Sequence, residues 1–314
     1  MITITRFNLA HVVANDKKLF NSNNHGDVQP ADYHDACDRS KTSKWVDKFH
    51  AKTSYATIRI SDGPTVSWLK RAVEVGVHTG RVSNLYAEEV DELVAKLRRE
   101  FEQAVESIGD PPEGVFLRTE HVSLKYGIHG VGPYKKADWR KVVESLVSSS
   151  KGHECIRPND PNCVLYVFPW IKEFEPDLEF RVFVHKNQVT AVSQQHLYGV
   201  NQVLKNKSDD EIRNEIMDPL LEYFNETVKE ALADVGSYTM DFALIPQPNG
   251  RYSPYFIEIN AFGAEYAAGS ALFHWINDEA VLLGDGSSVE LRFNDRNKQE
   301  SIQETYDASS TEDA

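Results

Sequence analysis

Hydrophobic residues recur at two different spacings along this chain, and each spacing predicts one kind of element. Apolar residues at helical spacing, with charges between them, predict a long helix from Val90 to Ile108. The same spacing predicts helices over 136–147 and 209–234. Alternating or continuous apolar runs predict strands over 53–60, 114–120, 162–171, 178–185, 188–195, 238–245 and 255–260. Helices and strands in this order predict a fold of the mixed α and β class.

The patterning also divides the chain into zones. Residues 1–44 are rich in Asn, Asp, His, Ser and Lys and show little periodicity, which predicts an irregular or partly disordered lead-in. We expect an N-terminal lobe over 45–160 and a C-terminal lobe over 161–293, because a chain of 314 residues is long enough for two moderate domains. The polar, acidic stretch 294–314 predicts a flexible tail.

Charge and composition narrow the classes of partner. A net charge of −14, from 48 acidic and 34 basic residues, repels phosphate backbones and anionic membranes, so we expect neither nucleic acid nor membrane as a partner. The start of the chain lacks the basic and apolar segments of a signal peptide, and no stretch is apolar enough to span a bilayer. The three cysteines, without CxxC spacing, fit a reducing compartment, so we expect a cytoplasmic protein.

Polar side chains interrupt two neighbouring strands near the C-terminal end of the pattern. Glu258 and Asn260 occupy alternate positions of an otherwise apolar strand, and therefore share one face. Asp241 lies in the strand 238–245. The turn sequence PQPNG at 246–250 joins this strand, as a hairpin, to the strand that carries Glu258 and Asn260. If the hairpin pairs, these three oxygen-bearing side chains converge.

Two carboxylates about 5 Å apart repel by roughly 3 kcal/mol at an effective dielectric near 20, so they need a shared proton, a basic residue or a metal. Mg²⁺ commonly binds through one or two carboxylates together with substrate phosphates. We therefore name Asp241, Glu258 and Asn260 as candidate metal ligands. The alternative is that these polar residues form a strand face exposed to water. The bulky Phe256, which we expect on the same face, argues against this alternative.

Basic residues that could hold phosphates are present. Arg181 shares a strand face with Glu179, and the alternative to a binding role is a partly exposed ion pair. Arg118 ends a predicted strand, and Lys125 precedes a glycine-rich stretch that includes Gly130. A glycine-rich turn lets backbone N–H groups approach an anion, although a plain surface loop has the same composition.

At these motifs the chain resembles a known family. LEFRVFVHKNQVTAVSQQ, then YTMDFALI, then FIEINAFGAEYAAGSALFHW is similar to the cell-division-cycle protein 123 family, whose members read EFRCFV, a strand ending SQR, a DxY strand and IDFNPFG. The resemblance covers roughly residues 45–304. It implies an α+β fold of the ATP-grasp type, in which two lobes with mixed and antiparallel sheets clasp Mg-ATP.

Family ligand positions fall on particular residues of this chain. The resemblance places metal ligands at Asp241, Glu258 and Asn260, with Glu258 where many relatives have Asp. It places Arg118 at a phosphate-binding lysine and Lys125 at a second lysine. Arginine in place of lysine keeps the charge but changes the geometry.

The remaining correspondences concern the rest of the nucleotide. Arg181 matches the arginine of the family EFR motif, and the strand end at Trp170 and Ile171 matches the adenine hinge. Here FPWI replaces an LRKW-like sequence, which removes two basic residues from the hinge. Ala261 stands where relatives have the proline of NPFG.

The best understood family members act as assembly factors, or chaperones, for eukaryotic translation initiation factor 2 and bind its gamma subunit. The resemblance thus implies an ATP- and Mg²⁺-binding assembly protein. The alternative is an ATP-dependent carboxylate–amine ligase that acts through an acyl phosphate. The sequence shows no evident place for a carboxylate substrate, which favours the assembly function, and whether the protein is an enzyme stays open.

Overall fold

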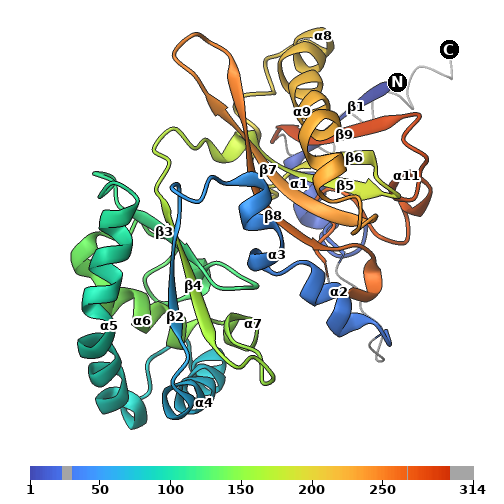
Figure 1. Cartoon of the computed structure of the whole chain (residues 1–314). Helices are drawn as coiled ribbons and strands as arrows, with labels where there is room; N and C mark the ends of the chain where they lie inside the picture. Colours follow the sequence, from blue (N-terminus) through green and yellow to red (C-terminus); the bar gives the residue numbers. More distant parts are fainter. Residues whose placement is uncertain (23–29, 267, 298–314) are drawn as a thin grey trace, which may run out of the picture. The chain divides into compact units, whose positions relative to one another are not determined.

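The computed structural model describes residues 1–22, 30–266 and 268–297. The chain forms two compact units (Figure 1). Unit 1 comprises Met1–Ala36 and Glu173–Ala314, and unit 2 comprises Cys37–Lys172. Within the described residues, no helix has both the length and the apolar character to cross a membrane.

Unit 1 is built on a six-stranded sheet. Its strands, in spatial order, are β1 (Ile2–Asn8), β9 (Val289–Arg296), β6 (Gln188–Gln194), β5 (Glu179–His185), β7 (Tyr238–Pro246) and β8 (Tyr252–Ala261). β9 runs parallel to both β1 and β6, and the remaining neighbours are antiparallel. The sheet is therefore mixed.

One face of this sheet carries a long helical run. The run comprises α8 (Asp209–Ile212), a π-helical stretch (Arg213–Met217), α9 (Asp218–Tyr223), a second π-helical stretch (Phe224–Val228) and α10 (Lys229–Ala231). Its apolar stripe is fully buried, and the Tyr223 ring lies 5.5 Å from that of Phe242 on β7. The helix predicted over 209–234 is thus confirmed, and it covers the face of the sheet to which Phe242 points.

The other face is covered by the chain between β8 and β9. This stretch contains a 3₁₀ turn (Ala264–Tyr266) and α11 (Glu279–Leu282), and a further 3₁₀ turn (Pro176–Leu178) precedes β5. The Phe183 ring on β5 lies 5.3 Å from the Phe273 ring and 5.5 Å from the Trp275 ring. A small apolar cluster forms there, next to the polar residues described below.

The expectation of an irregular lead-in over 1–44 is wrong for the described residues. β1 is an edge strand of the main sheet, and three helices follow: α1 (Leu9–Ala14), α2 (Tyr33–Arg39) and α3 (Thr42–Phe49). The Asn8 side chain caps α1 by accepting a hydrogen bond from the Ala10 amide. An edge strand and short helices bury few side chains, so their sequences show little apolar period.

Unit 2 is built on a three-stranded antiparallel sheet in the order β2 (Ala56–Ile60), β4 (Cys163–Pro169) and β3 (Val115–Arg118). Its helices after α3 are α4 (Gly63–Thr79), α5 (Ala87–Ser107), α6 (Trp139–Ser148) and α7 (Gly152–Cys155), with 3₁₀ turns at Asn84–Tyr86, Leu124–Tyr126 and Lys136–Asp138. Apolar residues of α4, α5 and α6 pack on one sheet face, which bears Ile58, Leu117 and Leu165.

The unit boundaries differ from the expected lobes of 45–160 and 161–293. The strand expected to open the C-terminal lobe is β4, which pairs with β2 and β3 inside unit 2. The chain enters unit 1 at Glu173. At the C-terminal end, β9 continues to Arg296, and the expected acidic tail lies from residue 298 outside the described residues.

Candidate functional site

A row of mutually opposite residues crosses the whole sheet of unit 1. We call it the polar row; from edge to edge it consists of Thr5, Arg292, Ser193, Arg181, Asp241 and Glu258. Residues that lie directly opposite each other point to the same face of a sheet. The predicted meeting of Asp241 and Glu258 is therefore present, at the end of the row.

A β-bulge in β8 sets which side chains share this face. Asp241 lies opposite Glu258, but the next residue, Phe242, lies opposite Phe256, so Ile257 is the extra residue. The bulge reverses the alternation of the strand, and Phe256 is 2% exposed on the face opposite to that of Glu258. The expectation that Phe256 shares the face of Glu258 is wrong for this reason.

Arg181 and Asp241 form the centre of the site. Arg181 donates from Nε to Oδ1 of Asp241 at 2.8 Å and from Nη2 to Oδ2 at 2.7 Å. Gln195, which sequence analysis did not single out, donates from Nε2 to the same Oδ2 at 3.1 Å. Asp241 is 2% exposed, so its charge depends on these donors.

Nearby carboxylates outnumber the guanidinium. Burial raises the pKa of Asp241 and the neighbouring Glu258 adds to this, while Arg181 acts in the opposite direction. Burial alone lowers the pKa of Arg181, but Asp241, Glu258 and then Glu179 raise it above its ordinary value. Within the described residues, the Arg181 guanidinium thus acts on three carboxylate side chains, an arrangement that favours a bound proton or a further cation. Arg181 forms its ion pair across the sheet with Asp241, and the charge of Glu179 on its own strand adds to the rise of its pKa.

Asn260 lies two residues after Glu258 in β8 and therefore on the same face of the sheet. It lies opposite Thr239, and both Nδ2 of Asn260 and Oγ1 of Thr239 are buried without a hydrogen-bond partner among the described residues. Buried polar atoms are nearly always hydrogen-bonded, so these two fit a site that receives a polar ligand. The amide and the two carboxylates supply hard oxygen atoms that suit Mg²⁺. Across the described part of the chain, no group of three His, Cys, Asp or Glu side chains forms a metal cluster.

The predicted site residues divide between the two units. Glu179, Arg181, Asp241, Glu258 and Asn260 belong to unit 1, and Arg118, Lys125, Gly130, Trp170 and Ile171 belong to unit 2. Arg118 ends β3 with 2% exposure, and its guanidinium carbon lies 4.9 Å from the Trp45 ring centroid. Lys125 is exposed, with Nζ 5.3 Å from the ring centroid of Tyr126.

Backbone N–H groups of the glycine-rich stretch are already hydrogen-bonded to other groups of unit 2. Ile128 N–H donates to Oγ of Ser148 at 2.9 Å, and His129 N–H donates to Oγ of Ser145 at 3.3 Å. Gly130, with a left-handed φ of 71°, donates its own N–H to the preceding turn. These amides do not form the open anion cradle that the sequence suggests, so a role in phosphate binding requires the stretch to rearrange.

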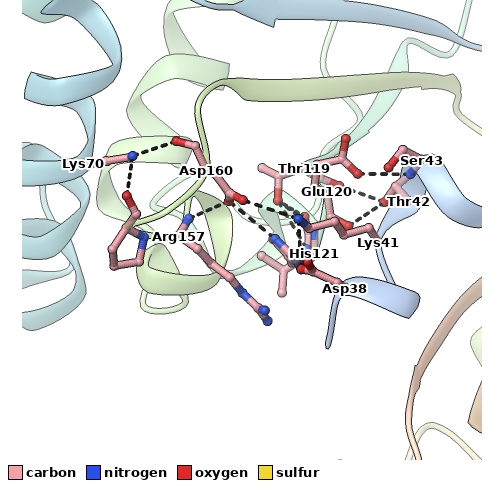
Figure 2. Close-up of polar contacts among 12 residues, drawn as sticks. Asp38, Lys41, Thr42, Ser43, Lys70, Thr119, Glu120, His121, Arg157 and Asp160 are labelled. Atoms are coloured by element: carbon pink, nitrogen blue, oxygen red, sulfur yellow. Dashed lines mark hydrogen bonds and ion pairs between the residues drawn. The ribbon is translucent and has the colours of Figure 1, made fainter. Parts of the chain in front are cut away.

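A charged network that sequence analysis missed holds the start of α3 in unit 2 (Figure 2). The Asp160 carboxylate accepts from Arg157 N–H at 2.8 Å and lies 3.5 Å from Nε2 of His121 and 3.6 Å from Nζ of Lys41. Burial acts to raise the pKa of Asp160, but these partners lower it to about 2. Because α3 carries Trp45, the network fixes the ring that covers Arg118.

The hinge residues follow the end of β4. Trp170 donates its backbone N–H to the Gly114 carbonyl at 2.9 Å, which continues the pairing of β4 with the chain before β3. Ile171 follows directly, within unit 2. Their assignment to adenine stays a prediction from the resemblance.

Comparison with known proteins identifies the family. A family model described as D123 matches residues 140–312, more than half of the chain. The chain belongs to the D123 family. None of the curated proteins compared with the chain matches it.

Solved structures agree in fold. Cdc123 from Schizosaccharomyces pombe matches with a TM-score of 0.54 at 15% identity, covering 82% of this chain and 97% of that one. A C-terminally truncated form of the same protein matches with a TM-score of 0.53 at 15% identity, with the same coverage. An ATP-grasp RimK domain protein from Sphaerobacter thermophilus covers 59% of this chain and 54% of its own at 13% identity, with a TM-score of only 0.31. The D123 protein thus has the predicted α+β fold, with one mixed and one antiparallel sheet.

Proposed function

We propose that this D123 protein binds Mg-ATP and that its metal site is the acidic end of the polar row, formed by Asp241 and Glu258. The observation that carries the proposal is the facing pair of Asp241, which is 2% exposed, and the half-buried Glu258, whose charges act together with that of Glu179 on the Arg181 guanidinium. The unpartnered Nδ2 of Asn260 beside the pair is a hydrogen-bond donor that a phosphate oxygen would satisfy, which supports the nucleotide part of the proposal. Two facing carboxylates with one neutralising arginine leave negative charge that a divalent cation offsets.

The residues take distinct roles in this proposal. Glu258 and Asn260 offer side-chain oxygens to Mg²⁺, together with Asp241, and Arg181 offers N–H donors to phosphate oxygens. Bound Mg²⁺ would neutralise phosphate charge. By resemblance, Arg118 and Lys125 of unit 2 contribute further positive charge.

The resemblance assigns further nucleotide contacts to residues of unit 2. Gly130 and its neighbours would approach phosphate oxygens after rearrangement, and Trp170 and Ile171 would contact adenine. The proposal predicts that ATP protects 125–134 from hydrogen exchange, because ordering of the stretch slows its opening. Unchanged exchange there at saturating ATP removes the stretch from the site.

Calorimetric titration with ATP tests the metal site. Wild-type protein should bind ATP with Mg²⁺ and lose most of this affinity in EDTA. Glu258→Gln, which keeps shape but removes the charge, should weaken Mg-dependent binding by about tenfold or more. Glu226→Gln, on the exposed side of the helical run, is the matched control and should bind like wild type. Equal affinity of the two variants would remove the acidic end of the polar row from the site.

We further propose that the protein serves, in the cytoplasm, as an assembly factor for eukaryotic translation initiation factor 2, through the gamma subunit. Membership of the D123 family and the Cdc123-like fold support this partner. A pull-down with the tagged full-length chain from its native host, with and without Mg-ATP, tests it. Recovery of the gamma subunit in stoichiometric amount supports the proposal, and its absence under both conditions favours the ligase alternative.

A further inference from the structure

A second row of paired residues borders the acidic end of the polar row. Phe183, Thr239 and Asn260 lie directly opposite one another on β5, β7 and β8. Each is two positions from a residue of the polar row in its own strand, so its side chain points to the same face of the sheet. The second row therefore lies next to the candidate metal site, on the side of the sheet to which the carboxylates point.

Within the described residues, Thr239 is the buried threonine whose hydroxyl has no protein partner. Thr239 is 0% exposed, and its Oγ1 is buried without a hydrogen bond. The other buried threonines of the described chain each donate their hydroxyl to a protein oxygen: Thr42, Thr65, Thr119 and Thr190. Buried polar atoms are nearly always hydrogen-bonded, so the Thr239 hydroxyl indicates a partner that is not part of the chain.

Asn260 supplies the complementary atom. Its Nδ2 is likewise buried without a partner among the described residues, although Asn260 and Thr239 are directly paired. Directly paired residues carry Cβ atoms about 4.5–5.5 Å apart. One water molecule spans such a gap, because it accepts a hydrogen bond from the amide and donates one to the hydroxyl oxygen.

The surroundings of Thr239 restrict this partner to a small molecule. On its other side Thr239 lies opposite Phe183, whose ring packs against those of Phe273 and Trp275. All three aromatic residues are buried. This enclosure favours a single water over a phosphate group at the hydroxyl. The Asn260 amide nitrogen carries two N–H donors, so a water at one of them leaves the other for a ligand.

We propose that Thr239 is a positioning residue: through one buried water it holds Nδ2 of Asn260, so that the amide oxygen Oδ1 is presented to the metal. This role deepens the proposed Mg-ATP site and rests on it. An amide binds a cation through its oxygen, and its nitrogen then needs an acceptor of its own. Groups that hold the far atom of a metal ligand fix its orientation and raise the affinity for the metal.

Thr239→Val tests this role, because valine keeps the branched shape of the side chain and lacks only the hydroxyl oxygen. Calorimetry on the full-length chain with ATP and Mg²⁺ should give about tenfold weaker binding than in wild type. Thr239→Ser keeps the hydroxyl and should bind within about threefold of wild type. Without ligand, the melting temperature of Thr239→Val should stay within about 2 °C of wild type or rise, because no hydrogen bond to another protein group is lost.

Thr190→Val is the matched control from the same sheet. Thr190 is also 0% exposed, but its Oγ1 donates to the Leu282 carbonyl at 2.9 Å. Loss of this donor should lower the melting temperature by about 2 °C or more and leave the affinity for Mg-ATP at the wild-type value. The two variants thus separate a loss of stability from a loss of binding.

A double-mutant cycle with Asn260→Asp isolates the amide. This substitution replaces the amide by a carboxylate, whose two ends are both oxygens and need no such orientation. In that background, Thr239→Val should change the Mg-dependent affinity by less than about threefold, compared with about tenfold beside the native amide.

The outcomes separate the two proposals. No Mg-ATP binding by wild type would overturn the proposed function and this role of Thr239 with it. Wild-type binding together with an unchanged affinity in Thr239→Val would overturn the role of Thr239 alone. An equal loss of affinity in the Asn260→Asp background would also overturn it, because the hydroxyl would then act on a group other than the amide.

Discussion

At the scale of single residues, the Arg181–Asp241 ion pair stands out because it is buried at the centre of a sheet. Buried ion pairs add little stability compared with apolar residues of the same volume, since both charges lose their hydration. The bidentate contact, with both Asp241 oxygens bonded, is what makes the two charges tolerable. Such a pair is better explained by a ligand that uses it than by a need for stability.

Arg181→Met should lower the free energy of unfolding by about 3–5 kcal/mol, because it leaves Asp241 buried without its charge partner. The double variant Arg181→Met/Asp241→Leu should recover most of this loss, since no buried charge of the pair remains. Urea unfolding of wild type, the double variant and the two single variants Arg181→Met and Asp241→Leu measures the difference. If the double variant is as unstable as the sum of both single variants, the two residues are not coupled.

The residue-level predictions succeed where they depend only on strand alternation. Period 2 and a hairpin turn are enough to place Asp241 beside Glu258. They cannot identify Gln195 as a donor to Asp241, because Gln195 directly follows the end of β6, which lies on the other side of β5. They also pair Arg181 with Glu179 on its own strand, whereas the structure pairs it across the sheet.

At the scale of elements, the bulge at Ile257 is the feature that orients the site. It allows Phe256 to enter the core while Glu258, two positions later, stays on the polar-row face. Nothing in the letters YFIEIN marks this position, because the bulge residue is itself an ordinary strand former. The alternation predicted from sequence is therefore correct on one side of Ile257 only.

Deletion of Ile257 should be tolerated, with a melting temperature within about 5 °C of wild type, because Phe256 and Glu258 keep their partners in a regular ladder. Deletion of Ile259, a 2% exposed residue two positions on, is the comparison. This deletion should lower the free energy of unfolding by about 3 kcal/mol or more, because a polar neighbour must enter the core. Thermal unfolding measures both, and equal loss in the two deletions would contradict the bulge.

The anchoring of α3 gives a pH-dependent prediction. The pKa of Asp160 is about 2, below its ordinary value, so its contribution to stability is present above about pH 4 and is lost as the pH falls toward 2. Asp160→Asn should destabilise the protein by about 1–2 kcal/mol at pH 7, a figure reduced for partial exposure. It should also flatten the dependence of stability on pH between about 4 and 2.

Urea unfolding across this pH range measures the effect. Asp218→Asn, at an exposed position of the helical run, is the control and should keep the wild-type slope. A wild-type slope in Asp160→Asn as well would show that the network in Figure 2 does not contribute to acid stability.

At the scale of the whole molecule, sequence analysis identifies the class of fold and the family but not the course of the chain. β1 pairs with β9 from the opposite end of the sequence, and β4 returns to the sheet of β2 and β3. The hydrophobic period of a strand shows which of its side chains are buried, but it does not show which other strand it pairs with. Pairing between distant strands therefore leaves no signal in the sequence of either strand. This limit explains why the sequence wrongly predicts an irregular lead-in over 1–44 and places the boundary between the lobes near residue 160.

The assembly function predicts binding without turnover. Incubation of the purified protein with Mg-ATP and a metabolite extract should release no ADP above a control without protein, because an assembly factor uses the nucleotide to stabilise one conformation. Steady ADP release that depends on Glu258 would instead support the carboxylate–amine ligase.

A crystal structure of the protein with Mn²⁺ and a non-hydrolysable ATP analogue, with the metal located by its anomalous scattering, would show directly where the metal binds. We expect the metal among Asp241, Glu258 and Asn260, with the phosphates on its open side. A fully occupied metal and nucleotide at another place, with the Arg181–Asp241 pair unchanged and Glu258 without a ligand, would contradict this expectation.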